Sequence, residues 1–203
     1  MTATKLNKHQ VKTKETRELL LRAAEEVFVR KGYAGAELGE IASLAGRTKG
    51  AIYAQFESKE DIFMALVEEH ALRHRSEMEK VLVNSTSVEQ NREAFRRLCM
   101  RLSGEEAWNL LMLEFKLYAV RNPEAKRRFQ KFITKMIPPE AEKRLTGLLG
   151  AERNGKQVLK RSLSVQIIQP LLSAITLESL FDPEVLNEDA RKKLTGRIFD
   201  ALI

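Results

Sequence analysis

The sequence has few of the residues that interrupt regular structure or cross-link a chain. Proline occurs 5 times and glycine 10 times in 203 residues, so long helices are possible. A single cysteine, Cys99, excludes an internal disulfide, and with only three histidines it makes no plausible zinc cluster. We expect Cys99 to be a small core residue rather than a reactive thiol, and we expect no metal or other cofactor.

Long apolar runs are also scarce. The first residues, MTATKLNKHQVKTK, have no apolar core of the kind found in a signal peptide. No apolar run approaches the ~18 residues that a membrane-spanning helix needs. We therefore expect a cytoplasmic protein that does not bind membranes.

Positive charge is in excess and unevenly distributed. The net charge is +7, and residues 1–59 hold 11 Lys and Arg against 7 Asp and Glu, a net +4. Lys5, Lys8, Lys12 and Lys14 precede any acidic residue. Such an arm fits a solvated tail and a phosphate-contacting arm equally well.

Helical periodicity dominates the chain. From Glu15 to Gly32, apolar residues recur on one helical face, and no later stretch shows the sustained alternation of a strand. The sequence predicts an all-α protein of about nine helices. We expect an N-terminal three-helix domain at residues 1–60, with its basic arm, and a larger helical domain at residues 61–203.

Residues 38–56 have the dimensions of a helix-turn-helix. Gly46 ends a short helix, and Thr48 is placed to cap the next one, whose inward residues are Ile52 and Phe56. The exposed face of that second helix would fit the major groove of DNA. The alternative is a helical hairpin with a solvated basic face. The residues predicted to bind DNA are Arg47, Thr48, Lys49, Gly50, Tyr53, Gln55 and Lys59.

Residues 19–70 resemble the DNA-binding domain of the tetracycline-repressor (TetR) family of bacterial transcription regulators. The resemblance implies an all-α homodimer that binds DNA through its N-terminal domain and a small molecule through its C-terminal domain. It usually implies repression that ends when the small molecule binds. The residues that carry it are Ala24, Phe28, Gly32, Tyr33, Ile41, Ala42, Ala45, Gly46, Lys49, Gly50, Tyr53, Phe56, Ser58 and Lys59.

Four positions depart from the family pattern. The Thr/Ser pair that commonly caps the first helix of the motif and touches phosphate is replaced by Ala36 and Glu37. Arg47 replaces a small aliphatic residue in the turn and adds a potential phosphate contact, whereas Ala54 removes a potential base contact. Base recognition therefore depends mainly on Lys49, Tyr53 and Gln55.

The larger domain contains apolar and polar residues that suit a pocket for a small organic effector, although most such residues in proteins simply form core. We predict a mainly apolar effector. The candidate pocket residues are Trp108, Asn109, Met112, Phe115, Tyr118, Phe132, Gln166 and Gln169.

The last two predicted helices, at about 156–181 and 184–203, are apolar on several sides, so they need packing partners on several sides. A second subunit would supply one of them through a four-helix bundle. The alternative is a monomeric core. The residues predicted at the dimer interface are Ile168, Leu172, Ile175, Leu194, Ile198 and Leu202.

No catalytic constellation is evident. His70 and His74 have a spacing that could hold a metal, but the sequence places no suitable third ligand beside them. We predict a sequence-specific DNA-binding transcription regulator. We expect it to be a repressor that a small apolar organic effector releases from a palindromic operator. The alternative is an all-α enzyme that binds a small molecule and does not bind DNA.

Overall fold

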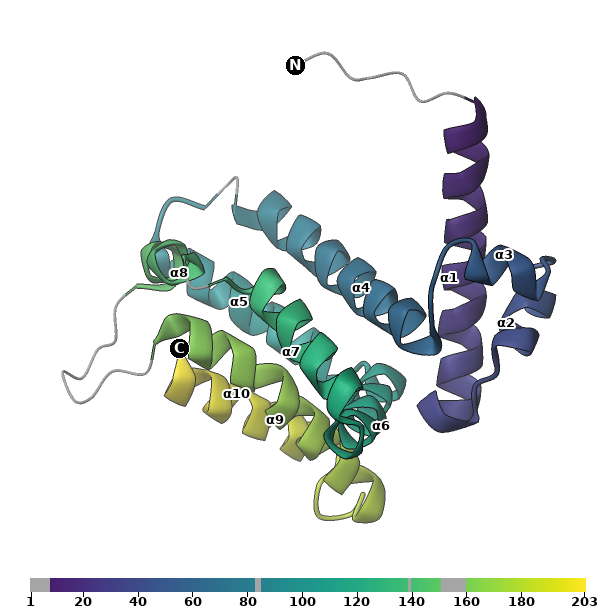
Figure 1. Ribbon diagram of the computed structural model, residues 1–203. Coiled ribbons are helices and arrows are strands. Elements are labelled where there is room, and N and C mark those ends of the chain that lie inside the picture. Colours follow the sequence, from purple (N-terminus) through teal and green to yellow (C-terminus); the bar gives the residue numbers. More distant parts are fainter. Residues whose placement is uncertain (1–7, 83–84, 139, 151–159) are drawn as a thin grey trace. The chain divides into compact units, whose positions relative to one another are not determined.

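The computed structural model describes residues 8–82, 85–138, 140–150 and 160–203. These residues form ten helices and no strand, in agreement with the predicted all-α class (Figure 1). One more helix is present than the predicted nine, and α7 (Pro123–Met136) ends before Pro138 and is followed by a distinct α8 (Ala141–Leu149). Lys5 of the predicted basic arm lies outside the described residues.

The chain divides into two compact units, Met1–Glu69 and His70–Ile203. The first contains α1 (Lys8–Gly35), α2 (Leu38–Leu44), α3 (Lys49–Tyr53) and the first part of α4 (Lys59–Leu82). The predicted domain boundary after residue 60 lies near the start of α4. The first part of that helix stays with the N-terminal unit because Ile62, Phe63 and Leu66 are buried in its core.

Three aromatic rings form the centre of the first unit. Phe28 and Tyr33 of α1 stack with ring centroids 5.7 Å apart, and Phe63 of α4 meets both rings edge-on. Gly32 lies between Phe28 and Tyr33 in the sequence and adopts a φ of 71°. This conformation ends the long regular part of α1, and Tyr33 is buried in the core. This core supports the two short helices that follow.

The second unit is a bundle built around α9 (Arg161–Phe181), which packs against four neighbours. These are α5 (Val88–Ser103), α6 (Glu106–Arg121), α8 and α10 (Glu188–Leu202) (Figure 1). Its core includes the buried residues Cys99, Leu149, Ile168, Leu172, Phe199 and Ile203. The interpretation of Cys99 as a core residue agrees with its 1% exposure, and burial raises the pKa of its thiol to about 12.

Candidate nucleic-acid interface

Helices α2 and α3 are joined by a four-residue turn that begins at Ala45 and contains Gly46. Gly46 has a φ of 62°, a conformation that residues with a Cβ rarely adopt. The Arg47 amide donates to the Ala42 carbonyl at 2.8 Å and closes the turn. Thr48 then caps α3 by accepting a hydrogen bond from the Ala51 amide at 3.3 Å. The cap predicted from the sequence is present.

Opposite faces of α3 meet protein and solvent. Ile52 is fully buried and Phe56, which follows the helix, is 4% exposed, so both side chains anchor the segment to the first unit. Lys49 and Gly50 are exposed on the other face, and Tyr53 is 61% exposed. This face carries no acidic side chain, since α3 reads Lys-Gly-Ala-Ile-Tyr. It can therefore approach a polyanion without repulsion from its own residues.

The turn adds a further cation beside this face. Arg47 is exposed, and its guanidinium donates only to the neighbouring Gly46 carbonyl, at 3.1 Å, among the hydrogen bonds of the described residues. A single neutral acceptor leaves most of its five N–H donors directed to solvent. Gln55 is half-buried, and its backbone carbonyl accepts a long hydrogen bond of 3.5 Å from Arg17.

Lys59 does not have the surroundings expected of a phosphate contact. Its ammonium donates to the carbonyl oxygens of Tyr33, Ala34 and Ala36 at 2.8, 3.2 and 3.1 Å. These bonds use all three of its donors and satisfy carbonyl groups at the end of α1 and just beyond it. Burial lowers the pKa of Lys59. The predicted DNA contact is thus replaced by a structural role, which sequence spacing could not indicate.

The start of α2 lacks the polar cap that the family pattern commonly provides. Ala36 is buried, and Glu37 occupies the N-cap position without a side-chain hydrogen bond to the helix. Glu37 is exposed, so its carboxylate adds negative charge at the end of α2 where helix N–H groups could otherwise meet a phosphate. A phosphate contact from this helix end therefore has no side-chain support.

The comparisons with known proteins point to one family. The model of the family described as bacterial regulatory proteins, tetR family, matches residues 20–66. The curated regulator YdgC of Bacillus subtilis is 30% identical over 180 residues, which cover 85% of this chain and 87% of YdgC. The chain belongs to the TetR family. YdgC is itself described as an uncharacterized HTH-type transcriptional regulator.

Similarity within the TetR family is concentrated in the DNA-binding unit. The repressor BepR of Brucella suis is 53% identical over 53 residues, and this match covers 26% of the chain and 25% of BepR. The chain thus spans about a quarter of the length of such relatives. A solved SmeT–triclosan complex is 22% identical with a TM-score of 0.59 and covers 92% of this chain and 90% of SmeT. SmeT is described as the repressor of a Stenotrophomonas maltophilia multidrug efflux pump. These TetR-family relatives are regulators, and they give no support to the alternative enzyme.

One helix of this TetR-family chain, α9, is long and apolar enough to cross a membrane by length and composition alone. This finding corrects the expectation that no apolar run approaches the length of a membrane-spanning helix. Core helices of soluble proteins meet the same criteria, and α9 packs against four helices of its own unit. The match to bacterial transcription regulators favours a core helix of a soluble protein.

The predicted effector residues lie mostly in the core of the second unit. Met112 and Phe115 are buried, and Phe115 packs edge-on against Phe129. Trp108, Tyr118, Phe132, Gln166 and Gln169 are partly buried. That these residues line a ligand pocket stays a prediction.

A polar chain that the sequence did not reveal links α6 to α9. Lys116 donates to Gln169 at 3.0 Å, Gln169 donates to Ser173 at 2.7 Å, and Ser173 donates to the buried Asn109 at 3.2 Å. Asn109 also donates to the Leu102 carbonyl at 2.8 Å. Asn109 and Gln169 therefore have hydrogen-bond partners within the protein, as buried polar groups generally do.

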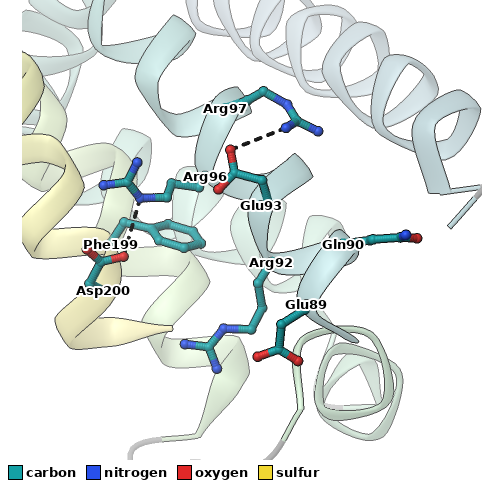
Figure 2. A pocket seen from close by; sticks show the side chains of 8 residues that line it. All are labelled: Glu89, Gln90, Arg92, Glu93, Arg96, Arg97, Phe199 and Asp200. Carbon is teal, nitrogen blue, oxygen red and sulfur yellow. Dashed lines mark hydrogen bonds and ion pairs between the residues drawn. The ribbon is translucent and has the colours of Figure 1, made fainter. Parts of the chain in front are cut away.

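A groove of about 510 Å³ lies elsewhere, between α5 and α10 (Figure 2). It contains two ion pairs, Arg96 with Asp200 at 3.3 Å and Arg97 with Glu93 at 3.2 Å. Phe199 is the one apolar residue among those that line it. The groove includes none of the predicted effector residues, and its charged lining differs from the predicted apolar pocket.

Half of the predicted dimer contacts are unavailable to a second subunit. Ile168, Leu172 and Ile175 are buried in the core of their own unit, with exposures of 4%, 1% and 7%. Leu194 is exposed, and Ile198 and Leu202 are partly buried. The apolar residues of α9 that do face solvent lie at other positions of the helix, namely Leu163, Ile167, Leu177, Leu180 and Phe181.

Proposed function

We propose that this TetR-family protein is a cytoplasmic, homodimeric repressor that binds a palindromic operator and is released by a small apolar organic effector. The observation that carries the proposal is that one side of the α3 segment is buried and the other side is exposed. Ile52 and Phe56 fix the segment from behind, while Lys49, Gly50 and Tyr53 remain exposed on its other face. A helix so placed can enter the major groove with its N-terminal residues near base edges.

Each exposed group on this face suits a different part of DNA. Lys49 is placed to donate to guanine acceptors, and Gly50 lets the backbone come close to the bases. Tyr53 and Arg47 offer donors to phosphate oxygens, and the amide of Gln55 could pair with adenine or a phosphate. Thr48 holds the helix start in place through its cap.

A homodimer is supported by the apolar residues that α9 leaves in solvent. Leu163, Ile167 and Leu177 are 46%, 39% and 36% exposed and lie on one side of the helix, opposite the core residues. Large apolar patches on a soluble protein mark association sites. A two-fold dimer also doubles the DNA contact, because one five-residue recognition helix reads few bases.

The effector proposal is supported by the family and by the composition of the second unit. The SmeT–triclosan complex shows that a protein of the same fold binds a small organic compound. The partly buried aromatic residues Trp108, Tyr118 and Phe132 would supply apolar contact for such a ligand. Selection of DNA duplexes would give the operator sequence, and screening of small compounds would identify the effector.

DNA selection tests the first part of the proposal. Random duplexes retained by the purified protein should converge on a palindrome, and binding should weaken steeply as salt rises. Lys49→Ala and Tyr53→Ala should each weaken binding of that duplex by about 1–3 kcal/mol. Lys131→Ala, which removes an exposed lysine from α7, is the matched control and should change affinity little. Equal affinities for Lys49→Ala and Lys131→Ala would contradict the assignment of α3.

Effector binding is tested on the same duplex. A panel of lipophilic compounds is first screened for ligands that raise the melting temperature of the protein. A compound that binds the second unit should then lower operator affinity. Unchanged affinity at saturating ligand would rule out release, and the absence of any salt-dependent DNA binding would favour the enzyme alternative.

A further inference from the structure

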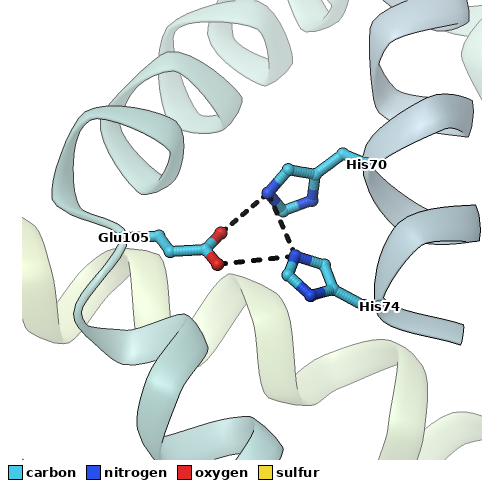
Figure 3. A group of neighbouring side chains, drawn as sticks. All are labelled: His70, His74 and Glu105. Carbon is cyan, nitrogen blue, oxygen red and sulfur yellow. Dashed lines mark hydrogen bonds and ion pairs between the residues drawn. The ribbon is translucent and has the colours of Figure 1, made fainter. Parts of the chain in front are cut away.

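Two histidines and a carboxylate converge in the second unit, and none of the three is among the residues proposed to bind DNA or the effector. His70 and His74 lie one turn apart on α4, and Glu105 directly precedes α6 (Figure 3). One ligand atom from each residue lies within 4.8 Å of the others. The sequence showed the histidine pair but not this third group, because Glu105 lies 35 positions from His70.

The distances between the donor atoms match the spacing around a tetrahedral metal ion. Bonds of about 2.0–2.2 Å to nitrogen and oxygen place two ligands of a tetrahedral ion about 3.3–3.6 Å apart. His74 Nε2 lies 3.2 Å from His70 Nε2 and 3.4 Å from Glu105 Oε1. The third distance, 2.7 Å from His70 Nε2 to Glu105 Oε2, is a hydrogen bond that would open when an ion replaces its proton.

The three side chains can be held together by hydrogen bonds or by a cation. Each imidazole can donate from Nε2 to one oxygen of the Glu105 carboxylate, at 2.7 Å from His70 and 3.4 Å from His74, which leaves the two nitrogens in contact at 3.2 Å without a hydrogen bond between them. A cation between them would use both lone pairs and the carboxylate together. Such a site would hold three protein ligands and leave the fourth position open.

The position of Glu105 is a second, independent observation. Glu105 is the N-cap residue of α6, yet its side chain makes no hydrogen bond to the start of that helix. The carboxylate is directed to the two imidazoles instead (Figure 3). A carboxylate that could cap its own helix but is directed to two imidazole nitrogens has the orientation of a metal ligand.

The charges around the cluster favour a cation. Arg101 donates to Glu77 at 2.5 Å, and His74 Nδ1 lies 3.6 Å from the same carboxylate and 3.4 Å from the Arg101 guanidinium. The opposite charges of Arg101 and Glu77 cancel, and Glu105 supplies the remaining negative charge. Burial, followed by the neighbouring His70, lowers the pKa of His74.

We propose that His70, His74 and Glu105 form a three-ligand site for a divalent transition-metal ion of the Zn²⁺ type. Imidazole and carboxylate ligands suit Zn²⁺ and its neighbours among the first-row metals. All three side chains are only partly buried, so an ion can reach them from solvent. Bound metal would join the second half of α4 to the corner between α5 and α6.

The chain contains its own reporter for this site. Trp108 is the single tryptophan, and it stacks on His70 with ring centroids 4.1 Å apart. The full-length protein, freed of metal with a chelator, should bind one equivalent of Zn²⁺ per chain in calorimetry. Co²⁺ should produce the visible bands of tetrahedral coordination and quench the fluorescence of Trp108.

Substitutions separate a metal site from an ordinary ion pair. His74→Ala and Glu105→Gln should each weaken Zn²⁺ binding by more than the roughly 10–100-fold that loss of an outer-shell partner causes. Glu106→Gln, which changes an exposed glutamate one position away, and His9→Ala, which changes the third histidine, should leave binding unchanged. The conservative Glu105→Gln keeps the test valid if His74→Ala does not fold.

Two results would overturn the proposal. One is the absence of stoichiometric Zn²⁺ or Co²⁺ binding by the folded protein, which would leave the cluster as a His–Glu ion pair. The other is metal binding that His74→Ala and Glu105→Gln do not alter, which would place the ion elsewhere on the chain. Neither result bears on DNA binding by α3, which is measured separately.

Discussion

At the scale of single residues, two lysines ten positions apart have opposite surroundings. Lys49 is exposed at the start of α3, whereas the ammonium of Lys59 donates to three backbone carbonyls and lies 4.8 Å from the centre of the Tyr33 ring. Both belong to the family pattern seen in the sequence. Only the first is free to meet DNA, and the second stabilises the end of α1.

Lys59→Met should therefore act on folding. It keeps the apolar stem but removes a charged donor from three carbonyl oxygens, so the free energy of unfolding should fall by about 1–2 kcal/mol. Lys49→Met, the matched control, should change it by less than about 0.5 kcal/mol. Urea unfolding followed by circular dichroism measures both, and equal stabilities would show that the three hydrogen bonds contribute nothing.

Cys99 provides a pH-dependent prediction. Its folded-state pKa is raised from 9.0 to about 12, so between these values the folded state binds more protons than the unfolded state. The stability that the buried thiol contributes is present below pH 9 and is lost as pH rises above it. From pH 8 to pH 10, the wild type should lose about 1 kcal/mol more than Cys99→Ala. Identical losses in urea unfolding would contradict burial of the thiol.

At the scale of helices, α3 and α4 of the DNA-binding unit each begin with a polar cap. Thr48 caps α3 at 3.3 Å and Ser58 accepts a hydrogen bond from the Asp61 amide at 3.2 Å at the start of α4. Helix α2 differs, because Glu37 stands at its N-cap without a side-chain hydrogen bond. The first helix of the motif is consequently less well fixed at its N-terminus.

Glu37→Ser should improve both folding and DNA binding. A serine hydroxyl at the N-cap can accept from the free amides of α2, and stability should rise by about 0.5–1 kcal/mol. Removal of the carboxylate also ends its repulsion of phosphate, so operator affinity should increase. Glu37→Ala removes the charge without the cap and separates the two effects. If the melting temperature of Glu37→Ser is no higher than that of Glu37→Ala, the serine does not cap α2.

At the scale of the whole molecule, α9 has two apolar sides, one buried in the core of its own unit and one exposed. Leu172 is 1% exposed and packs in the core with Cys99 and Phe199, whereas Ile167 is 39% exposed. Apolar residues recur on both sides of α9 in the sequence. Periodicity therefore could not show which side packs against other helices of the same chain. The exposed side is the one that a second subunit would cover.

Ile167→Glu and Leu172→Ala should therefore differ in kind. Ile167→Glu places a charge in the proposed interface and should give a folded monomer in sedimentation or light scattering, with operator affinity reduced. Leu172→Ala leaves a cavity in the core and should lower the free energy of unfolding by about 2–5 kcal/mol. A dimer that persists in Ile167→Glu would place the interface away from this side of α9.

The sequence by itself determined the helical class, the helix-turn-helix and the anchoring of Ile52 and Phe56, because these depend on contacts among residues close in the chain. Local spacing fixes which side of a short helix is apolar, and Gly46 and Thr48 fix where the helices end. The TetR resemblance extended over the same local segment.

The tertiary structure decided the rest, because it concerns partners distant in sequence. Lys59 finds carbonyl groups 23 to 26 positions away, and Glu105 meets a histidine 35 positions away. The inward side of α9 is likewise chosen by helices from elsewhere in the second unit. Periodicity along one helix carries no information about which residues another helix brings to it, and only the folded chain supplies that.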